Sequence, residues 1–226
     1  MTPRPFQMDT EILDRIRPML FHDAPRVAEL HHAAMGNSLW AQLGKGFLTV
    51  LYQQLVNDER FIAFVYLEGA SIRGFIAGSQ DPDLMMHEVF RKSWFLLGPA
   101  AMPQALHPRI LKKLMETTRY AEASNAVQLP GPVKAESLFC SFEKDLRGKR
   151  ISGHINKVLF DDLLARGHRY VKVTTETDND GANRQLRSWG FESCGEFDFY
   201  GKQMCTYVLE LSTSERVDPV SRHPTV

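Results

Sequence analysis

One continuous segment, residues 135–177, most constrains what this chain can fold into. "AESLFCSFEKD" has the aromatic and small residues of a strand, and "RYVKVTTET" has the branched residues of a second strand. Between them, five apolar residues recur on one helical face, and Gly167 stands where a helix would end (Ile151, Ile155, Val158, Leu159 and Leu163). Strands joined through a helix are typically parallel neighbours in one sheet, so the segment predicts a mixed α/β fold.

The flanking segments predict helices and hairpins. "HDAPRVAELHHAAM" predicts a helix with Asp23 as its N-cap and Pro25 in its first turn, and "LWAQLGKGFLTVLYQQLV" predicts another. "RFIAFVYLEGASIRGFIAGS" predicts a β-hairpin that turns at "EGAS". "NDGANRQLRSWG" predicts a short helix closed by Gly190, and a last hairpin should turn near Gly201.

Composition narrows the class of protein. The 226 residues suit one domain, or one domain with an insertion, and 27 basic residues balance 27 acidic ones. No overall charge therefore favours nucleic acid or an anionic membrane. Cys140, Cys194 and Cys205 show no CxxC spacing, which argues against a disulfide framework or a zinc site. With no signal-peptide core and no apolar span, we expect a cytoplasmic protein.

The loop between the two central strands is unusually basic. Arg147, Lys149 and Arg150 stand at a helix N-terminus, where positive charge is unfavourable by a few tenths of a kcal/mol each unless an anion binds. Gly148 and Gly153 give the backbone local freedom. The pattern favours a phosphate site, although a solvated basic turn is the alternative. A Walker loop is disfavoured because its lysine and hydroxyl residue are missing after Gly153.

Two blocks of this sequence resemble the GNAT superfamily of acyl-CoA-dependent N-acetyltransferases. The family's pyrophosphate loop has the pattern Q/R-x-x-G-x-G/A. Residues 147–152 fall in its register, matching at Arg147, Gly148 and Ile151, with Arg150 and Ser152 in place of motif residues. The family's N-x-x-A-x-x-x-Y-x-x-x-G-F block is matched at Asn179, Ala182, Gly190 and Phe191, with Leu186 at the tyrosine position. The resemblance covers 12–79 loosely and 135–211 well.

The resemblance implies a GNAT-like fold of the α+β class. A mixed, mostly antiparallel sheet would carry helices on both faces and splay where its two central strands run parallel. Residues 1–211 would form one domain, with a helical insertion at about 80–134 before the central strand, and 212–226 would be a disordered tail. The implied activity is acetyl transfer from acetyl-CoA to a primary amine by direct attack, without a metal. We expect a small-molecule acceptor, because no extended charged docking surface is evident. A longer acyl-CoA donor and a non-catalytic CoA-binding module remain alternatives.

The resemblance also implies roles for particular residues. The backbone of the loop would hold the CoA pyrophosphate (Arg147, Gly148, Lys149, Arg150, Ile151, Ser152 and Gly153). Phe142 and Glu143, at the end of the preceding strand, would pair with the pantetheine arm like an extra strand. Asn179 would hydrogen-bond that arm, act as a helix N-cap, or do both. His154 would either touch the cofactor or face solvent.

The resemblance implies that Glu136, early on the strand where related acetyltransferases often place a glutamate base, is the candidate general base. Strand alternation predicts that Glu136, Leu138, Cys140 and Phe142 share one face, where apolar neighbours would raise the pKa of the carboxyl group. The alternative is a surface glutamate at a strand end. A backbone N–H near Phe142 or Glu143 would stabilise the developing oxyanion.

Other chemically active residues are weaker candidates. Tyr200 or Tyr207 could replace the proton donor lost at Leu186, although packing roles are the alternative. Cys140 has no histidine partner in evidence, and the adjacent His31 and His32 would point to different faces of a helix. The apolar run "SWFLLG" in the insertion would roof the acceptor site, line an acyl channel, form a dimer contact or pack as a satellite helix.

Overall fold

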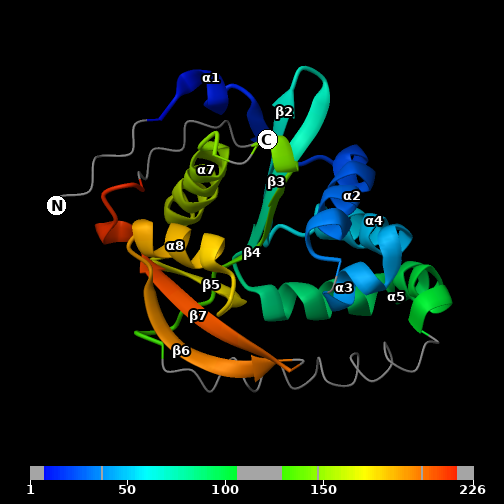
Figure 1. Cartoon of the computed structure of the whole chain (residues 1–226). Helices are drawn as coiled ribbons and strands as arrows, with labels where there is room; N and C mark the ends of the chain where they lie inside the picture. Colours follow the sequence, from blue (N-terminus) through cyan, green and yellow to red (C-terminus); the bar gives the residue numbers. More distant parts are fainter. Residues whose placement is uncertain (1–7, 37, 106–128, 147, 200, 218–226) are drawn as a thin grey trace.

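The computed structural model describes residues 8–36, 38–105, 129–146, 148–199 and 201–217. A seven-stranded sheet in the order β1-β2-β3-β4-β5-β7-β6 divides the molecule (Figure 1). Its strands are β1 (Ile16–Pro18), β2 (Phe61–Glu68), β3 (Ser71–Ser79), β4 (Glu136–Phe142), β5 (Tyr170–Glu176), β6 (Glu192–Phe199) and β7 (Lys202–Glu210). All neighbouring pairs are antiparallel except β4 and β5, which run parallel as the crossover predicted.

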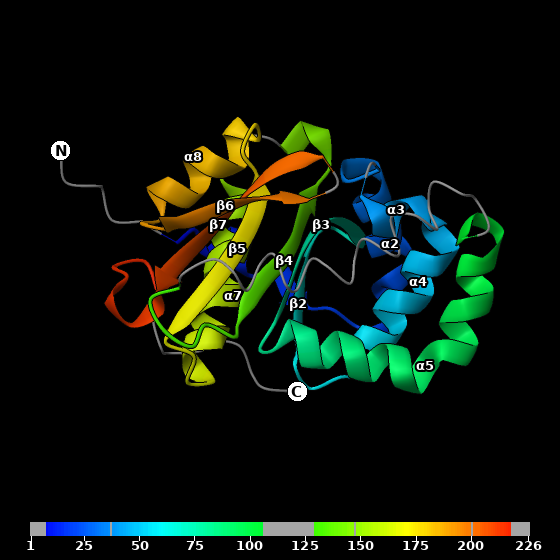
Figure 2. The ribbon, with the colours of Figure 1, turned by 90° about the horizontal axis from the view of Figure 1, so that it is seen from below.

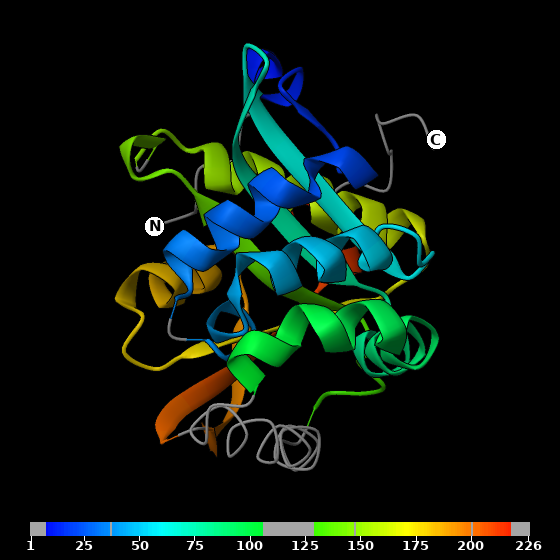
Figure 3. The same ribbon diagram turned by 90° about the vertical axis from the view of Figure 1, so that its right-hand side faces the viewer.

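Helices cover both faces of the sheet (Figures 2 and 3). They are α1 (Thr10–Leu13), α2 (Ala24–Ala34), α3 (Leu39–Gln42), α4 (Gly44–Leu55), α5 (Pro82–Ala105), α7 (Ile151–Ala165) and α8 (Asp180–Ser188), with 3₁₀ turns at Phe21–Asp23, Lys144–Leu146 and Leu211–Thr213. Helices α1, α7 and α8 pack on one face and α2 to α5 on the other. Two hydrophobic clusters result, with Ile155 and Leu159 fully buried in the first and Leu48 and Phe75 in the second. We call these the α7 face and the α2 face.

Most predicted boundaries are confirmed. Gly69 turns the β2–β3 hairpin with φ +60°, and Gly167 and Gly190 follow α7 and α8 with φ +86° and +87°. Asp23 is the N-cap residue of α2, but its side chain does not cap the helix. Its carboxylate instead accepts hydrogen bonds from the Arg17 guanidinium at 2.6 and 2.9 Å.

The insertion begins as a helix, as predicted. Helix α5 spans Pro82–Ala105 with non-helical angles at Ser93, while residues 106–128 of the predicted helical insertion lie outside the described residues. Leu97 packs into the α2-face cluster, but the neighbouring Trp94 is 70% exposed. No helix in the described ranges is long and apolar enough to cross a membrane.

The predicted disordered tail is wrong for residues 212–217. Val217 is only 8% exposed and packs into the α7-face cluster, and the guanidinium of Arg216 lies over the Trp189 ring. Residues 212–217 therefore belong to the folded domain, because apolar packing holds them. The remainder of the predicted tail, 218–226, lies outside the described residues.

Candidate functional site

The parallel strands β4 and β5 are paired at one end only. In the described part of the chain their single rung joins Glu136 to Lys172, where the Lys172 N–H donates to the Ala135 carbonyl at 2.9 Å. Beyond that rung, the edge of β4 from Leu138 to Phe142 faces β5 without a backbone ladder. We call this opening the β4–β5 gap.

The backbone of Phe142 is turned toward this gap. The Glu143 N–H donates to the Arg73 carbonyl of β3 at 2.9 Å. Because successive residues of an antiparallel strand bond to opposite sides, the Phe142 N–H points away from β3 and toward β5. The structure thus brings one of the two predicted oxyanion donors to the gap, while the N–H of Glu143 is used by β3.

A β-bulge changes which side chains of β4 share a face. Ala77 pairs with Phe139, but the next β3 residue, Gly78, pairs with Ser137, which leaves Leu138 as an extra residue. Leu138 packs in the α2-face cluster, whereas Cys140 and Phe142 pack in the α7-face cluster. The predicted common face is therefore wrong for Cys140 and Phe142, which lie on the face opposite to Leu138, because simple alternation takes no account of a bulge.

Glu136 lies on the α2 face in a buried ion pair. Its Oε2 is 3.2 Å from Lys172 Nζ, and the two side chains are 7% and 10% exposed. Lys172 stands between Val171 and Val173, which both pack on the α7 face, so its own side chain projects to the opposite face. Burial raises the pKa of Glu136, and Lys172 opposes that rise. A carboxylate in this setting is a stronger proton acceptor than an exposed one.

The loop that follows β4 contains two left-handed residues. Gly148 has φ +79°, and Arg150, the N-cap residue of α7, has φ +60° and ψ +4°. Where the structure describes the first turn of α7, no side chain caps it. The backbone N–H groups of Ile151 and Ser152 are therefore placed as a helix N-terminus places them for an anion. Lys149 and Arg150 are exposed beside them, and Arg147 lies outside the described residues.

Glu143 anchors the start of this loop. Its carboxylate pairs with Arg26 of α2 and with Arg73 of β3, whose Nε lies 2.5 Å from Glu143 Oε2. Arg73 also pairs with Asp145 at 2.6 Å. The Glu143 side chain is thus engaged in a local ion network, and its N–H, predicted to pair with the pantetheine arm like a strand, donates to β3.

His154 and Asn179 both have internal partners. His154 is 2% exposed, and its ring lies 2.9 Å from the Arg150 carbonyl and 2.9 Å from the Asp9 N–H, so it does not face solvent. Asn179 Oδ1 accepts from the Ala182 N–H at 3.2 Å, which confirms the N-cap role. Its Nδ2 lies 3.4 Å from Thr175 Oγ1 on β5.

The proton-donor candidates are buried or outside the described chain. Leu186, at the family's tyrosine position, packs in the α7-face cluster. Tyr207 is 2% exposed, and its hydroxyl accepts from Arg187 at 3.3 Å. Burial is the main cause that raises the pKa of Tyr207. Tyr200 lies outside the described residues.

Cys140 lacks the features of a nucleophile, and His31 lacks those of a metal ligand. Burial raises the pKa of the Cys140 thiol to about 12, although Asn156 Nδ2 lies 3.9 Å from its sulfur. Burial lowers the pKa of His31 to about 4, and electrostatic repulsion from His32 lowers it in the same direction. Its Nδ1 lies 2.8 Å from the Tyr52 hydroxyl, and its Nε2 has no partner within the described residues.

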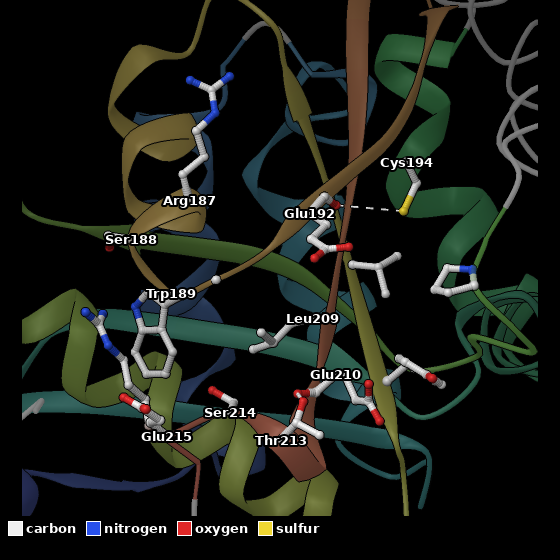
Figure 4. Close-up of a pocket in the computed structure, with 15 residues that line it drawn as sticks. Arg187, Ser188, Trp189, Glu192, Cys194, Leu209, Glu210, Thr213, Ser214 and Glu215 are labelled. Carbon is white, nitrogen blue, oxygen red and sulfur yellow. Dashed lines mark hydrogen bonds between the residues drawn. The ribbon is translucent and has the colours of Figure 1, made fainter. Parts of the chain in front are cut away.

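Two cavities lie away from the gap. A cavity of about 610 Å³ is bounded by the end of α8, the ends of β6 and β7, and the 3₁₀ turn after β7 (Figure 4). Arg187, Trp189, Glu192 and Glu215 are among its lining residues. A second cavity, of about 490 Å³, adjoins Arg26, Arg73 and Glu143. Neither contains Glu136 or Phe142, so we place the candidate site by backbone geometry.

Sequence reasoning missed Lys172 and the internal partners of His154. The signal for Lys172 was a lysine between two valines of a predicted central strand, which indicates a polar side chain on one buried face. The hydrogen bond between the His154 ring and the Arg150 carbonyl follows the i, i+4 spacing of a helix start. The second partner of the ring, Asp9, is 145 residues away in the sequence. Such long-range contacts have no local sequence signal.

No family model and no curated protein matches this sequence. Solved structures match it over 86–87% of its length. An N-acetyltransferase from Staphylococcus aureus Mu50 is 14% identical with a TM-score of 0.56 and is covered over 96% of its chain. A ribosomal-protein-alanine N-acetyltransferase from Brucella melitensis is 16% identical with a TM-score of 0.55 and 99% coverage. A candidate acetyltransferase of the GNAT family from Desulfovibrio desulfuricans is 11% identical with a TM-score of 0.51 and 97% coverage.

This chain has the GNAT fold. The fold predicted from the two sequence blocks is thereby confirmed, including the mostly antiparallel sheet and its central parallel pair. At these identities the likeness concerns the fold. The roles of individual residues in a GNAT reaction are proposals that rest on the geometry around the β4–β5 gap.

Proposed function

We propose that this protein transfers an acetyl group from acetyl-CoA to a primary amine by direct attack. The observation that carries the proposal is the β4–β5 gap, which has the Phe142 N–H directed into it and which leads to the uncapped start of α7. The backbone N–H groups of Ile151 and Ser152 suit a pyrophosphate, whereas those of Lys149 and Gly153 donate to the carbonyls of Leu146 and Arg150. The exposed side chains of Lys149 and Arg150 add positive charge beside the site. The residues present therefore fit CoA.

The residues of the chain would divide the chemistry as follows. Acetyl-CoA, when bound, supplies the acetyl thioester. The Phe142 N–H would stabilise charge that develops on the carbonyl oxygen. Glu136 and Phe142 stand at opposite ends of β4, about 20 Å apart along an extended strand. Glu136, whose pKa is raised by burial, would therefore accept the proton of the attacking amine through a chain of waters. Loss of the usual tyrosine at Leu186 is tolerable, because a thiol of pKa near 8.5 is an adequate leaving group without prior protonation.

The acceptor belongs to the class of primary amines. We favour a small-molecule acceptor, because the balanced charge of the chain gives no sign of an extended charged docking surface for a protein. A protein N-terminus is the second candidate, because one of the similar structures is a ribosomal-protein-alanine N-acetyltransferase. Assays that pair acetyl-CoA with polyamines or with N-terminal peptides would separate the two. Longer acyl-CoA donors tested in parallel address the alternative raised by the exposed Trp94.

Binding of acetyl-CoA is the first test. At one hundred times its Kd, the ligand should stabilise the folded protein by about 2.7 kcal/mol. The absence of any thermal shift at millimolar acetyl-CoA would refute the proposal. Binding without turnover on any amine would favour the non-catalytic CoA-binding module.

Glu136→Gln is the second test, and it addresses the base. It should lower kcat by about a hundredfold, with little change in the KM for acetyl-CoA. Unchanged turnover across several amines would remove Glu136 from the mechanism.

A further inference from the structure

Arg150 adopts a backbone conformation that side chains other than glycine rarely tolerate. It is the one non-glycine residue of positive φ in the described ranges. For an L-residue this left-handed conformation is strained, and it persists only where the surroundings enforce it. Because Arg150 opens α7 directly beside the proposed pyrophosphate loop, whatever enforces its conformation also shapes that loop.

Three donors converge on the carbonyl oxygen of Arg150. The backbone N–H groups of Gly153 and His154 lie 3.1 and 3.4 Å from it, as at the start of many helices. The third donor is the His154 ring, whose Nδ1 lies 2.9 Å away. The ring bond is the shortest of the three, and it comes from a side chain that is 2% exposed.

The ring of His154 is fixed from its other side. Its Nε2 lies 2.9 Å from the Asp9 N–H and accepts that hydrogen bond. In a neutral imidazole one nitrogen accepts and the other donates, so Nδ1 carries the proton and donates to Arg150. Asp9 is the N-cap residue of α1, which packs against α7. The orientation of the ring is therefore set by a segment remote in sequence.

We propose that His154 is a positioning residue that holds Arg150 in its left-handed conformation and so shapes the anion-binding loop. The inference deepens the proposed function, since it takes the ligand of that loop to be CoA. His154 does not touch the ligand in this scheme. It acts through the Arg150 carbonyl, while the backbone N–H groups of Ile151 and Ser152 would contact the phosphates.

The chain allows a matched set of variants. His154→Asn keeps an amide N–H close to the position of Nδ1 and loses the acceptor at Nε2. His154→Gln keeps an acceptor close to Nε2 and loses the donor to Arg150. Arg150→Gly removes the strain, because glycine adopts positive φ without steric cost. Leu163→Ala, a buried change near the far end of the same helix, serves as the control.

We expect His154→Gln to weaken CoA binding about tenfold in calorimetry and to lower the Tm by about 4 °C. His154→Asn should change affinity by less than about threefold, which is under 1 kcal/mol. In the Arg150→Gly background, His154→Gln should lose most of both effects, because no strained conformation is left to hold. Leu163→Ala should lower the Tm equally in both backgrounds.

Equal losses from His154→Gln with and without Arg150→Gly would overturn the inference, and so would a larger loss from His154→Asn than from His154→Gln. The Tm comparison needs no ligand. If the wild-type protein fails to bind CoA, the proposed function fails, while the Tm comparison still decides the role of His154.

Discussion

The carboxylate of Glu136 and the ammonium of Lys172 lie 3.2 Å apart at the single described rung that joins β4 to β5. Both side chains are at most 10% exposed, so neither charge is well solvated. A buried pair of this kind contributes little net stability, but removing one partner leaves an uncompensated charge. The ion pair lies at the end of the β4–β5 gap where the two strands are paired, and it links the candidate base on β4 to Lys172 on β5.

Lys172→Met should lower the free energy of unfolding by about 3 kcal/mol near pH 7, because it leaves Glu136 buried and unpaired. Burial already raises the pKa of Glu136, and loss of Lys172 raises it further. A carboxyl group whose pKa is raised in the folded state binds more protons there, so stability falls as pH rises through the raised value. The deficit should shrink as the pH is lowered toward the ordinary pKa of glutamate. Urea unfolding between pH 5 and 8 measures it.

The double variant Glu136→Gln/Lys172→Met is the control for this pair. It removes both charges and should recover more than half of the loss. A deficit in Lys172→Met that is independent of pH would show that lost packing, and not the unpaired carboxylate, causes it.

Arg150→Gly should raise the free energy of unfolding by about 1 kcal/mol, because the left-handed conformation is unstrained in glycine. Arg150→Ala removes the same charge but keeps a Cβ atom, so it should give no such gain. Thermal unfolding of the two variants separates backbone strain from charge. If alanine stabilises as much as glycine does, the gain comes from removing a cation at a helix N-terminus.

Gly74→Ala should disturb Phe142. A Cβ atom at Gly74 would lie 2.1 Å from Phe142 Cδ1 across the β3–β4 ladder. We expect a loss of about 2 kcal/mol from overpacking, together with a fall in kcat if the Phe142 N–H stabilises the oxyanion. Gly46→Ala is the control, because nothing lies within 4 Å of its Cβ position and alanine favours a helix. Unchanged kcat in a folded Gly74→Ala variant would contradict the role of Phe142.

The sequence predicted the fold well because the parallel crossover is local. Helix α7, its glycine stop at Gly167 and both flanking strands have periodic patterns that are visible within 45 residues. The bulge at Leu138 carries no comparable signal, since it depends on the pairing with β3, and it reversed the predicted face relationship between Glu136 and Cys140. The partners of Glu136 and His154 come from β5 and from the N-terminal segment, which no local pattern connects to them.

Cys140 should be inert although it lies beside the gap. Burial raises the pKa of the Cys140 thiol to about 12, so the reactive thiolate is scarce at pH 8. Iodoacetamide should therefore modify Cys140 far more slowly in the folded protein than in urea, as peptide mass spectrometry can measure. Under direct attack by the amine, Cys140→Ala should keep turnover within about threefold, because no acyl-enzyme forms. Acetylated Cys140 in the wild-type protein after incubation with acetyl-CoA would instead indicate a covalent route.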